Sequence, residues 1–121
     1  MNIAYTEING QKIAEIHSNE IIIQNAQDAL ELLVNCGYNG AVGVIVQENN
    51  LTPDFFELRT GIAGEILQKF STYQMRMAIV GDYSKFSSKS LNDFIYESNK
   101  VGRINFVKSM EEGRKALAKS S

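Results

Sequence analysis

The chain has 121 residues, of which 44% are hydrophobic and 21% charged, and its formal net charge is -2 at pH 7. This composition is typical of a globular protein, and we expect one domain over residues 1–121. The slightly acidic balance argues against a nucleic-acid partner, because such proteins usually carry a basic stripe. No apolar run reaches the roughly eighteen residues that a membrane span needs. The first ten residues lack the pattern of a secretion signal, and the lone Cys36 cannot form an internal disulfide, so we expect a cytoplasmic protein.

The N-terminal part of the chain predicts two strands and a helix. Asn2–Ile8 and Lys12–His17 alternate in polarity on either side of Asn9-Gly10, a strong signal for a tight hairpin, so we expect an antiparallel pair. The apolar run Ile21–Ile23 packs at the beginning of the next helix, Gln24–Cys36. Its predicted inward residues are Ala26, Ala29, Leu30, Leu33 and Val34. The apolar run Ala41–Gln47 that follows indicates a strand covered on both faces, hence a parallel central strand.

The stretch Leu51–Asp82 contains the single proline and an interrupted helix. Thr52 can cap a helix, Pro53 fits its first position, and Asp54 complements its positive end. The apolar spacing then continues to Phe70. An unbroken helix of this length would measure about 27 Å, against about 20 Å for a typical strand. We therefore expect the helix to break within Arg59–Gly61.

The remaining segments complete a regular alternation. Met75–Val80 predicts a second buried strand, Ser88 or Ser90 caps a helix that ends near residues 99–102, and Arg103–Lys108 predicts the last strand. Ser109 and Glu112 form a capping box for a final helix that ends near Lys119. The order predicts an α/β domain: a mixed sheet of about five strands, mostly parallel, with an N-terminal antiparallel hairpin and about four helices.

Two blocks of the sequence, LTPDFFELRTGIAGEILQKF and AIVGDYSKFSSKSLNDFIYESN, resemble a bacterial family catalogued as domain of unknown function 4180. The order of elements also resembles the STAS domains of sulphate transporters and anti-sigma-factor antagonists. In antagonist-type STAS domains a phosphorylatable serine lies at the start of the second helix, and Thr60-Gly61 falls near that place. Leu58-Arg59 departs from the acidic residue and first serine of that motif. The resemblance therefore implies Thr60 as a candidate phosphoswitch.

The connections that follow the parallel strands predict a second kind of site, because ligands of open α/β sheets bind beyond the carboxyl ends of the strands. The candidate rim residues are Asp54, Phe55, Phe56, Arg59, Asp82, Tyr83, Ser84, Phe86, Lys89 and Ser90. Structural interpretations compete with this one: Asp54 as a helix-start residue, Asp82 as a turn residue, the serines as caps, and the aromatic residues as a lid on the core. The isolated His17 and the apolar surroundings of Cys36 indicate no metal site and no cofactor.

Two classes of function follow. The first is a non-enzymatic protein-interaction or regulatory module, in which Thr60, Gly61, Gly64 and Glu65 form a partner-binding face for another protein or a second copy of the chain. The second is a small-ligand-binding or enzymatic domain that uses the rim at the C-terminal edge of the sheet. A deep pocket between the two connections would favour the second class, and a flat surface of small residues around Gly61 and Gly64 would favour the first.

Overall fold

The computed structural model describes residues 1–118 and contains a five-stranded sheet whose spatial order, β1-β2-β3-β4-β5, is the order of the strands in the chain. β1 and β2 are antiparallel, and the other neighbouring pairs are parallel, so the predicted mixed sheet is confirmed. The strands are β1 Asn2–Ile8, β2 Gln11–His17, β3 Ala41–Gln47, β4 Arg76–Val80 and β5 Ile104–Val107. The α-helices of the described residues are α1 Ala26–Tyr38, α2 Ile62–Thr72, α3 Lys89–Val101 and α4 Met110–Ala118.

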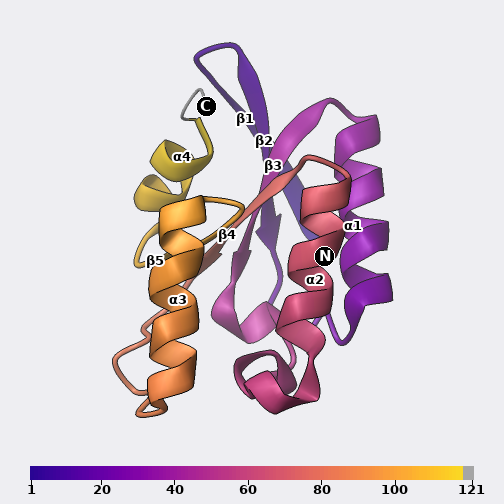
Figure 1. Cartoon of the computed structure of the whole chain (residues 1–121). Helices are drawn as coiled ribbons and strands as arrows, with labels where there is room; N and C mark the ends of the chain where they lie inside the picture. Colours follow the sequence, from indigo (N-terminus) through magenta and orange to yellow (C-terminus); the bar gives the residue numbers. More distant parts are fainter. Residues whose placement is uncertain (119–121) are drawn as a thin grey trace.

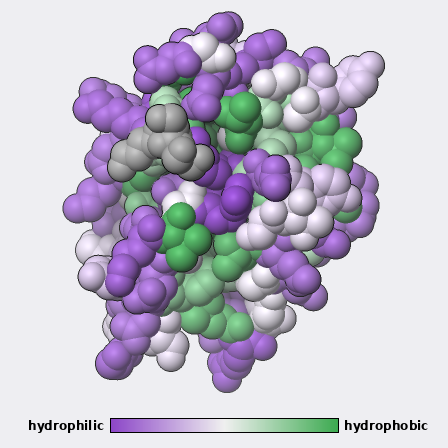
Figure 2. All heavy atoms as spheres, turned by 45° about the horizontal axis from the view of Figure 1, so that its top comes forward, coloured by the Kyte–Doolittle hydropathy of each residue, from purple (hydrophilic) through white to green (hydrophobic). Residues whose placement is uncertain are grey.

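The sheet separates two hydrophobic cores of different size. In Figure 1 the three connecting helices α1, α2 and α3 lie on one face of the sheet, and α4 lies on the other. The larger core joins those three helices to the sheet, whereas the smaller one is formed by Leu117 and Ala118 of α4 over Ile13, Ile45 and other strand residues. α1 packs directly against α2, while α2 and α3 make few direct contacts. Figure 2 shows hydrophobic side chains gathered in a band between the side that carries α3 and the side that carries α2.

The N-terminal elements confirm the predicted hairpin and correct one face of the first helix. Asn9 and Gly10 both have positive φ, at 53° and 78°, as a two-residue hairpin turn requires. α1 begins after Asn25, whose side chain accepts a hydrogen bond from the Asp28 N–H. The prediction that Val34 faces the core was wrong, because its side chain is 49% exposed. The core stripe of α1 consists of Ala29, Leu32, Leu33 and Cys36, and Val34 lies outside this stripe.

The connection from β3 to α2 is built from three short 3-10 turns, Glu48–Asn50, Pro53–Phe56 and Leu58–Thr60. The Thr52 side chain caps the second of them, as predicted, although the turn is 3-10 rather than α-helical. The predicted break within residues 59–61 is confirmed. Gly61 adopts the left-handed conformation with φ 80°, and α2 begins at the next residue. A left-handed residue redirects the chain and is inexpensive for glycine.

The C-terminal elements follow the predicted order. Ser88, the first of the two predicted caps, accepts a hydrogen bond from the Leu91 N–H and begins α3. Ser109 accepts one from the Glu112 N–H at 3.1 Å, so this half of the predicted capping box forms. The end of α4 that was predicted near Lys119 lies outside the described residues. Among residues 1–118 no helix combines the length and the apolar character needed to cross a membrane.

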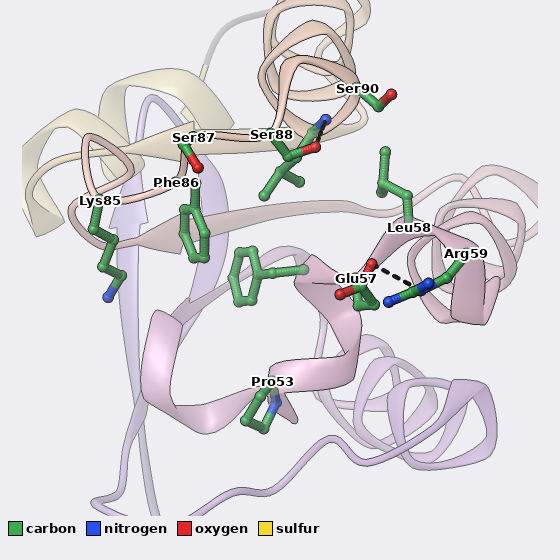
Figure 3. A pocket seen from close by; sticks show the side chains of 11 residues that line it. Pro53, Glu57, Leu58, Arg59, Lys85, Phe86, Ser87, Ser88 and Ser90 are labelled. Atoms are coloured by element: carbon green, nitrogen blue, oxygen red, sulfur yellow. Dashed lines mark hydrogen bonds and ion pairs between the residues drawn. The ribbon is translucent and has the colours of Figure 1, made fainter.

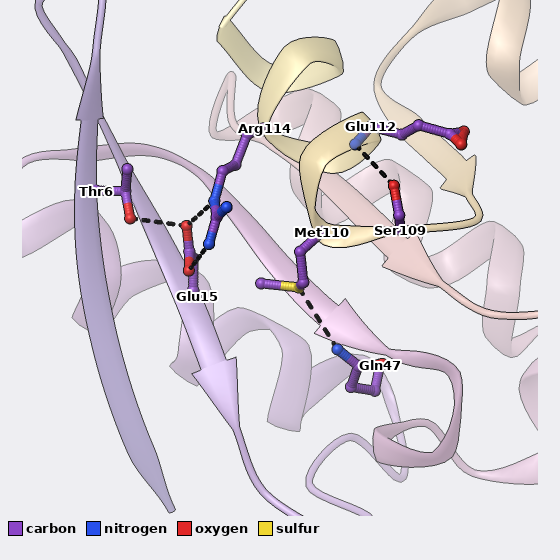
Figure 4. A network of polar contacts seen from close by, with 7 residues as sticks. All are labelled: Thr6, Glu15, Gln47, Ser109, Met110, Glu112 and Arg114. Atoms are coloured by element: carbon purple, nitrogen blue, oxygen red, sulfur yellow. Dashed lines mark hydrogen bonds and ion pairs between the residues drawn. The ribbon is translucent and has the colours of Figure 1, made fainter.

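An ion pair with a buried carboxylate connects α4 to β2. The Arg114 guanidinium donates two hydrogen bonds to the Glu15 carboxylate, at 2.6 and 2.9 Å, and the Thr6 hydroxyl donates a third at 2.7 Å (Figure 4). The Glu15 side chain is only 4% exposed. The hydrogen bond from Arg114 is the main reason why the pKa of Glu15 is below its ordinary value.

Candidate functional site

A hollow of about 510 Å³ lies at the C-terminal edge of the sheet, between the connection that follows β3 and the loop that follows β4. One wall is made by the turns at residues 53–59, and the other by residues 85–91, which include the start of α3. Figure 3 shows side chains from both walls around this space. The hollow is lined by Pro53, Phe56, Glu57, Leu58, Arg59, Lys85, Phe86, Ser87, Ser88, Ser90 and Leu91. Its volume is within the range typical of small-molecule sites, about 300–1,000 Å³.

Glu48 fixes the two connections relative to each other. Its carboxylate pairs with Lys85 across the gap and accepts a hydrogen bond from the Asp82 N–H at 3.3 Å. Gly81 allows this close approach, because a Cβ at that position would lie 2.6 Å from a Glu48 oxygen. The Lys85 ammonium also lies 5.5 Å from the centre of the Phe86 ring. The ion pair therefore holds the loop after β4 to the connection after β3, and the cation–π contact orders Lys85 and Phe86 within the loop itself.

The Phe56 and Phe86 rings stack on each other across the same gap. The ring centroids are 5.0 Å apart and the ring planes differ by 15°. Phe86 is labelled in Figure 3. A second hollow of about 310 Å³ shares these two rings, Pro53 and Lys85 with the first. Its other lining residues are Ile21, Glu48, Asn49 and Leu51. The ring pair thus forms part of the lining of both hollows.

Buried Asn50 holds the beginning of this connection in place. Its side-chain amide donates to the carbonyl oxygens of Ser18 and Glu20, both at 2.9 Å, and accepts from the Gln47 N–H at 2.8 Å. The residue is completely buried. The amide therefore ties the segment after β2 to the end of β3, and it satisfies backbone groups that would otherwise lack partners.

The structure brings four of the ten predicted rim residues to the 510 Å³ hollow: Phe56, Arg59, Phe86 and Ser90. Phe55 was also predicted on the rim, but it is fully buried in the larger core. Its ring packs edge-on against Phe56 at 5.0 Å. Phe55 lies in the core because the 3-10 turn at residues 53–56 directs its two adjacent aromatic residues to different sides.

Among the other predicted rim residues, the Asp54 side chain is exposed outside the lining of the hollow, and Asp82, Tyr83, Ser84 and Lys89 have structural contacts away from it. Asp82 accepts hydrogen bonds from the Ser84 hydroxyl at 2.6 Å and the Ser84 N–H at 3.1 Å, and these bonds lower the pKa of its carboxyl group. Tyr83 is half-buried and donates its hydroxyl proton to the Ile79 carbonyl, and burial raises the pKa of that phenol far above its ordinary value. Lys89 pairs with Asp93 within α3 at 2.9 Å.

The predicted partner face lies beside the hollow, at the start of α2. The Thr60 hydroxyl contacts the carbonyl oxygens of Asp54 and Glu57 at 2.8 and 2.9 Å, so its proton is directed at the preceding turns. Gly61 and Gly64 are exposed, and a Cβ built on either residue would meet no atom within 4 Å. Glu65 is exposed on the same part of the helix.

The polar groups at the sheet edge are mostly paired with one another. The Arg59 guanidinium lies 3.3 Å from the Glu57 carboxylate, and Lys85 pairs with Glu48. Within residues 1–118 no three His, Cys, Asp or Glu side chains are grouped as metal ligands would be. Sequence reasoning missed Glu48, Asn50 and Lys85. The sequence places all three in the two connections. It carries no signal that Glu48 would pair with Lys85 or that Asn50 would bond to the backbone after β2.

A family model described as "Domain of unknown function (DUF4180)" matches residues 8–117. The chain belongs to this family, because the match covers nearly all of it and includes both connections of the candidate site. No curated protein and no solved structure gives a significant match.

Proposed function

We propose that this protein is a non-enzymatic interaction module whose partner-binding face consists of Thr60, Gly61, Gly64 and Glu65. The observation that carries the proposal is the exposure of Gly64 in the first turn of the eleven-residue helix α2. A glycine inside a helix costs about 0.5–1 kcal/mol relative to alanine. No neighbouring atom of the described chain requires a glycine at this position. We infer that residue 64 is a glycine because the backbone of another protein approaches it closely.

The charges around this face define the partner. Asp54, Glu57 and Glu65 are exposed in or beside this face, and the Arg59 cation already pairs with Glu57. The unbalanced carboxylates attract a basic segment of the partner and repel an acidic one. The partner therefore presents a lysine- or arginine-containing surface with small residues opposite the glycines.

The regulatory part of the proposal concerns Thr60. The likeness to STAS domains, supported by a sheet whose strands follow chain order, makes this residue a candidate phosphoswitch. Phosphorylation would remove the hydroxyl proton that Thr60 directs at the carbonyl oxygens of residues 54 and 57. It would also place about −1.5 to −2 charges against those oxygens. We therefore propose that phosphorylation remodels the turns before α2 and with them the binding face, in a protein that acts in the cytoplasm.

The test combines cross-linking in the native host with two variants of the same residue. A photo-reactive residue at position 68, exposed one turn beyond Gly64, identifies the contacting protein, which is then purified and titrated. We expect Gly64→Ala to bind more weakly than the wild type, because its methyl group obstructs the partner's backbone, and Gly64→Arg to bind at least about tenfold more weakly, with neither variant melting below the wild type. Val101→Arg, at an exposed position at the end of α3, is the matched control. If Gly64→Arg binds normally, or if it unfolds, the proposal is wrong.

The 510 Å³ hollow favours a second candidate function, the binding of a small molecule. The lining combines apolar and polar groups. Pro53, Phe56 and Leu58 supply apolar surface, and the serine hydroxyls and Arg59 supply polar groups. This arrangement fits a compact molecule with an apolar body and a few polar groups. Native mass spectrometry of protein purified from its host tests this candidate. A bound molecule that is lost in Phe56→Ala but kept in Gly64→Arg supports ligand binding, and a protein without a bound molecule contradicts it.

A further inference from the structure

The two edge strands of the sheet, β5 and β1, differ in whether side chains occupy their outward-facing backbone groups. At one edge, the Asn99 side chain from α3 bonds to both outward-facing backbone groups of Phe106 in β5. The amide oxygen accepts from the Phe106 N–H at 2.7 Å, and the amide nitrogen donates to the Phe106 carbonyl at 3.3 Å. A side chain that occupies these groups blocks the addition of another strand at this edge.

The opposite edge, β1, carries no such block. Within residues 1–118 this strand pairs only with β2, along all seven of its residues. Its sequence, NIAYTEI, has no proline and a single charged residue, Glu7. Natural proteins usually protect a long edge strand with lysines, prolines, a bulge or a covering segment. An edge that lacks these devices presents a row of backbone donors and acceptors for a further strand.

A hollow of about 170 Å³ lies beside this edge, between β1 and α1. Its apolar walls come from Met1, Ile3, Ile22 and Leu32, and its polar end from Asp28, Glu31 and Asn35. One Asp28 oxygen accepts the Gln24 N–H at 2.9 Å. No cation of residues 1–118 forms a salt bridge with Asp28 or Glu31.

We propose that the free edge of β1 binds an extended segment of another protein by strand addition, with one lysine or arginine side chain of that segment in the hollow. Backbone hydrogen bonds to β1 supply affinity, and the hollow selects the side chain. The aliphatic stem of a lysine or arginine packs on Ile3 and Leu32, and its charged end reaches the carboxylates of Asp28 and Glu31. This site is independent of the Thr60–Glu65 face.

A second copy of the chain fits the edge less well than a basic segment does. The strand that it would add is β1 itself, which contains no lysine or arginine. Pairing of two β1 strands would leave both sets of carboxylates, Asp28 and Glu31 in each copy, without a cation. The chemistry of the hollow therefore favours a different, basic chain.

The first experiment selects ten-residue peptides from a random phage-displayed library on the immobilised full chain. We expect the selected peptides to share a lysine or arginine within a run of β-branched or aromatic residues. A fluorescein-labelled synthetic copy of one selected peptide is then the probe for fluorescence anisotropy. Amide hydrogen exchange measured with and without this peptide shows where it binds, and we expect protection of alternate amides of β1.

The second experiment changes charge without touching the edge strand. We expect Glu31→Lys to weaken peptide binding at least about tenfold and Asp28→Asn, which keeps an oxygen for Gln24, to weaken it about threefold. Glu97→Lys makes the same change of charge as Glu31→Lys at an exposed position on α3 and should bind as the wild type does. Melting temperatures confirm that each variant is folded.

Three results would overturn the proposal. The first is a selection that yields no peptide, or peptides without a basic residue. The second is equal binding by the wild type and Glu31→Lys, or a peptide that leaves the exchange of the β1 amides unchanged. The third is a dimer in sedimentation velocity whose β1 amides are protected without peptide, because a second copy would then occupy the edge.

Discussion

Arg114 of α4 forms a bidentate ion pair with Glu15 of β2, although the two residues are 99 positions apart in the chain. The pair fastens α4, which covers the second face of the sheet, to β2, the second strand of the N-terminal hairpin. The carboxylate is almost completely buried, whereas the Arg114 side chain is 39% exposed. Removing the arginine therefore leaves a buried negative charge that only the Thr6 hydroxyl can still bind.

Arg114→Ala should lower the free energy of unfolding by about 2 kcal/mol. Breaking a fully buried pair costs about 3–5 kcal/mol, and the partial exposure of Arg114 reduces this value. Urea denaturation followed by circular dichroism measures the effect. The neighbouring Lys115→Ala breaks only an exposed pair with Glu111 and should change the stability by less than about 0.5 kcal/mol. Equal effects of the two variants would contradict the importance of the buried pair.

Glu15 should also make the stability depend on pH. Its pKa in the folded protein lies below the ordinary value of 4.5, so the folded state favours the charged carboxylate. The resulting stabilisation is fully present above that ordinary value and is lost as the pH falls through the lowered pKa. Unfolding measured below about pH 5 should therefore show a smaller acid-induced loss in Glu15→Gln than in the wild type. An identical pH dependence in both proteins would be evidence against this role.

Asn50→Ala should destabilise the protein by about 2–3 kcal/mol, because it removes a completely buried side chain and leaves three partly buried backbone groups without their partners. The adjacent Asn49 is exposed, and Asn49→Ala should change the stability by less than about 0.5 kcal/mol. Thermal denaturation of both variants distinguishes them. A mild effect of Asn50→Ala would show that water or a rearranged backbone replaces the amide.

Gly64→Ala should stabilise the isolated protein by about 0.5–1 kcal/mol, since the new methyl group meets open space and alanine favours the helix. Gly113 in α4 provides the contrast. A Cβ there would lie 3.3 Å from the Ile45 side chain, which is completely buried, so Gly113→Ala should destabilise by about 1 kcal/mol. Chemical denaturation of the two variants should give shifts of opposite sign. A loss of stability in Gly64→Ala would mean that the domain itself needs the glycine.

Asn99→Ala should free the edge of β5. We expect a loss of about 1 kcal/mol in stability, much faster hydrogen exchange of the Phe106 amide, and more self-association at high concentration. The control Lys100→Ala changes an adjacent exposed residue and should leave that amide protected. Unchanged exchange at Phe106 in Asn99→Ala would show that another group covers this edge.

The local features of the fold could be predicted from the sequence because each depends on near neighbours. The Asn9-Gly10 turn, the apolar run of β3 and the break at Gly61 are all consequences of backbone conformation or burial within a few residues. The orientation of α1 was harder, because Val34 lies close to the true stripe and only packing against the sheet and α2 decides between the alternatives.

The candidate site was predicted in position but not in composition. The edge follows from strand direction, whereas the contacts of Glu48 with Lys85 and of Phe56 with Phe86 join residues 37 and 30 positions apart. Such pairs depend on how the connections after β3 and β4 pack against each other, and the sequence of either connection alone does not specify this. The Glu15–Arg114 pair is a stronger case, because nothing local in either segment indicates the other.

The order of the strands in the sheet, which is also their order in the chain, has a consequence for folding kinetics. Every strand after β1 pairs with the strand made immediately before it, so no pairing has to wait for a later part of the chain. Parallel pairing across connections of more than twenty residues is slower than formation of the N-terminal hairpin. The sheet can therefore grow from the N-terminal hairpin during synthesis, one strand and one helix at a time. The contact between α4 and β2 bridges almost the whole chain, and its docking should be the last step.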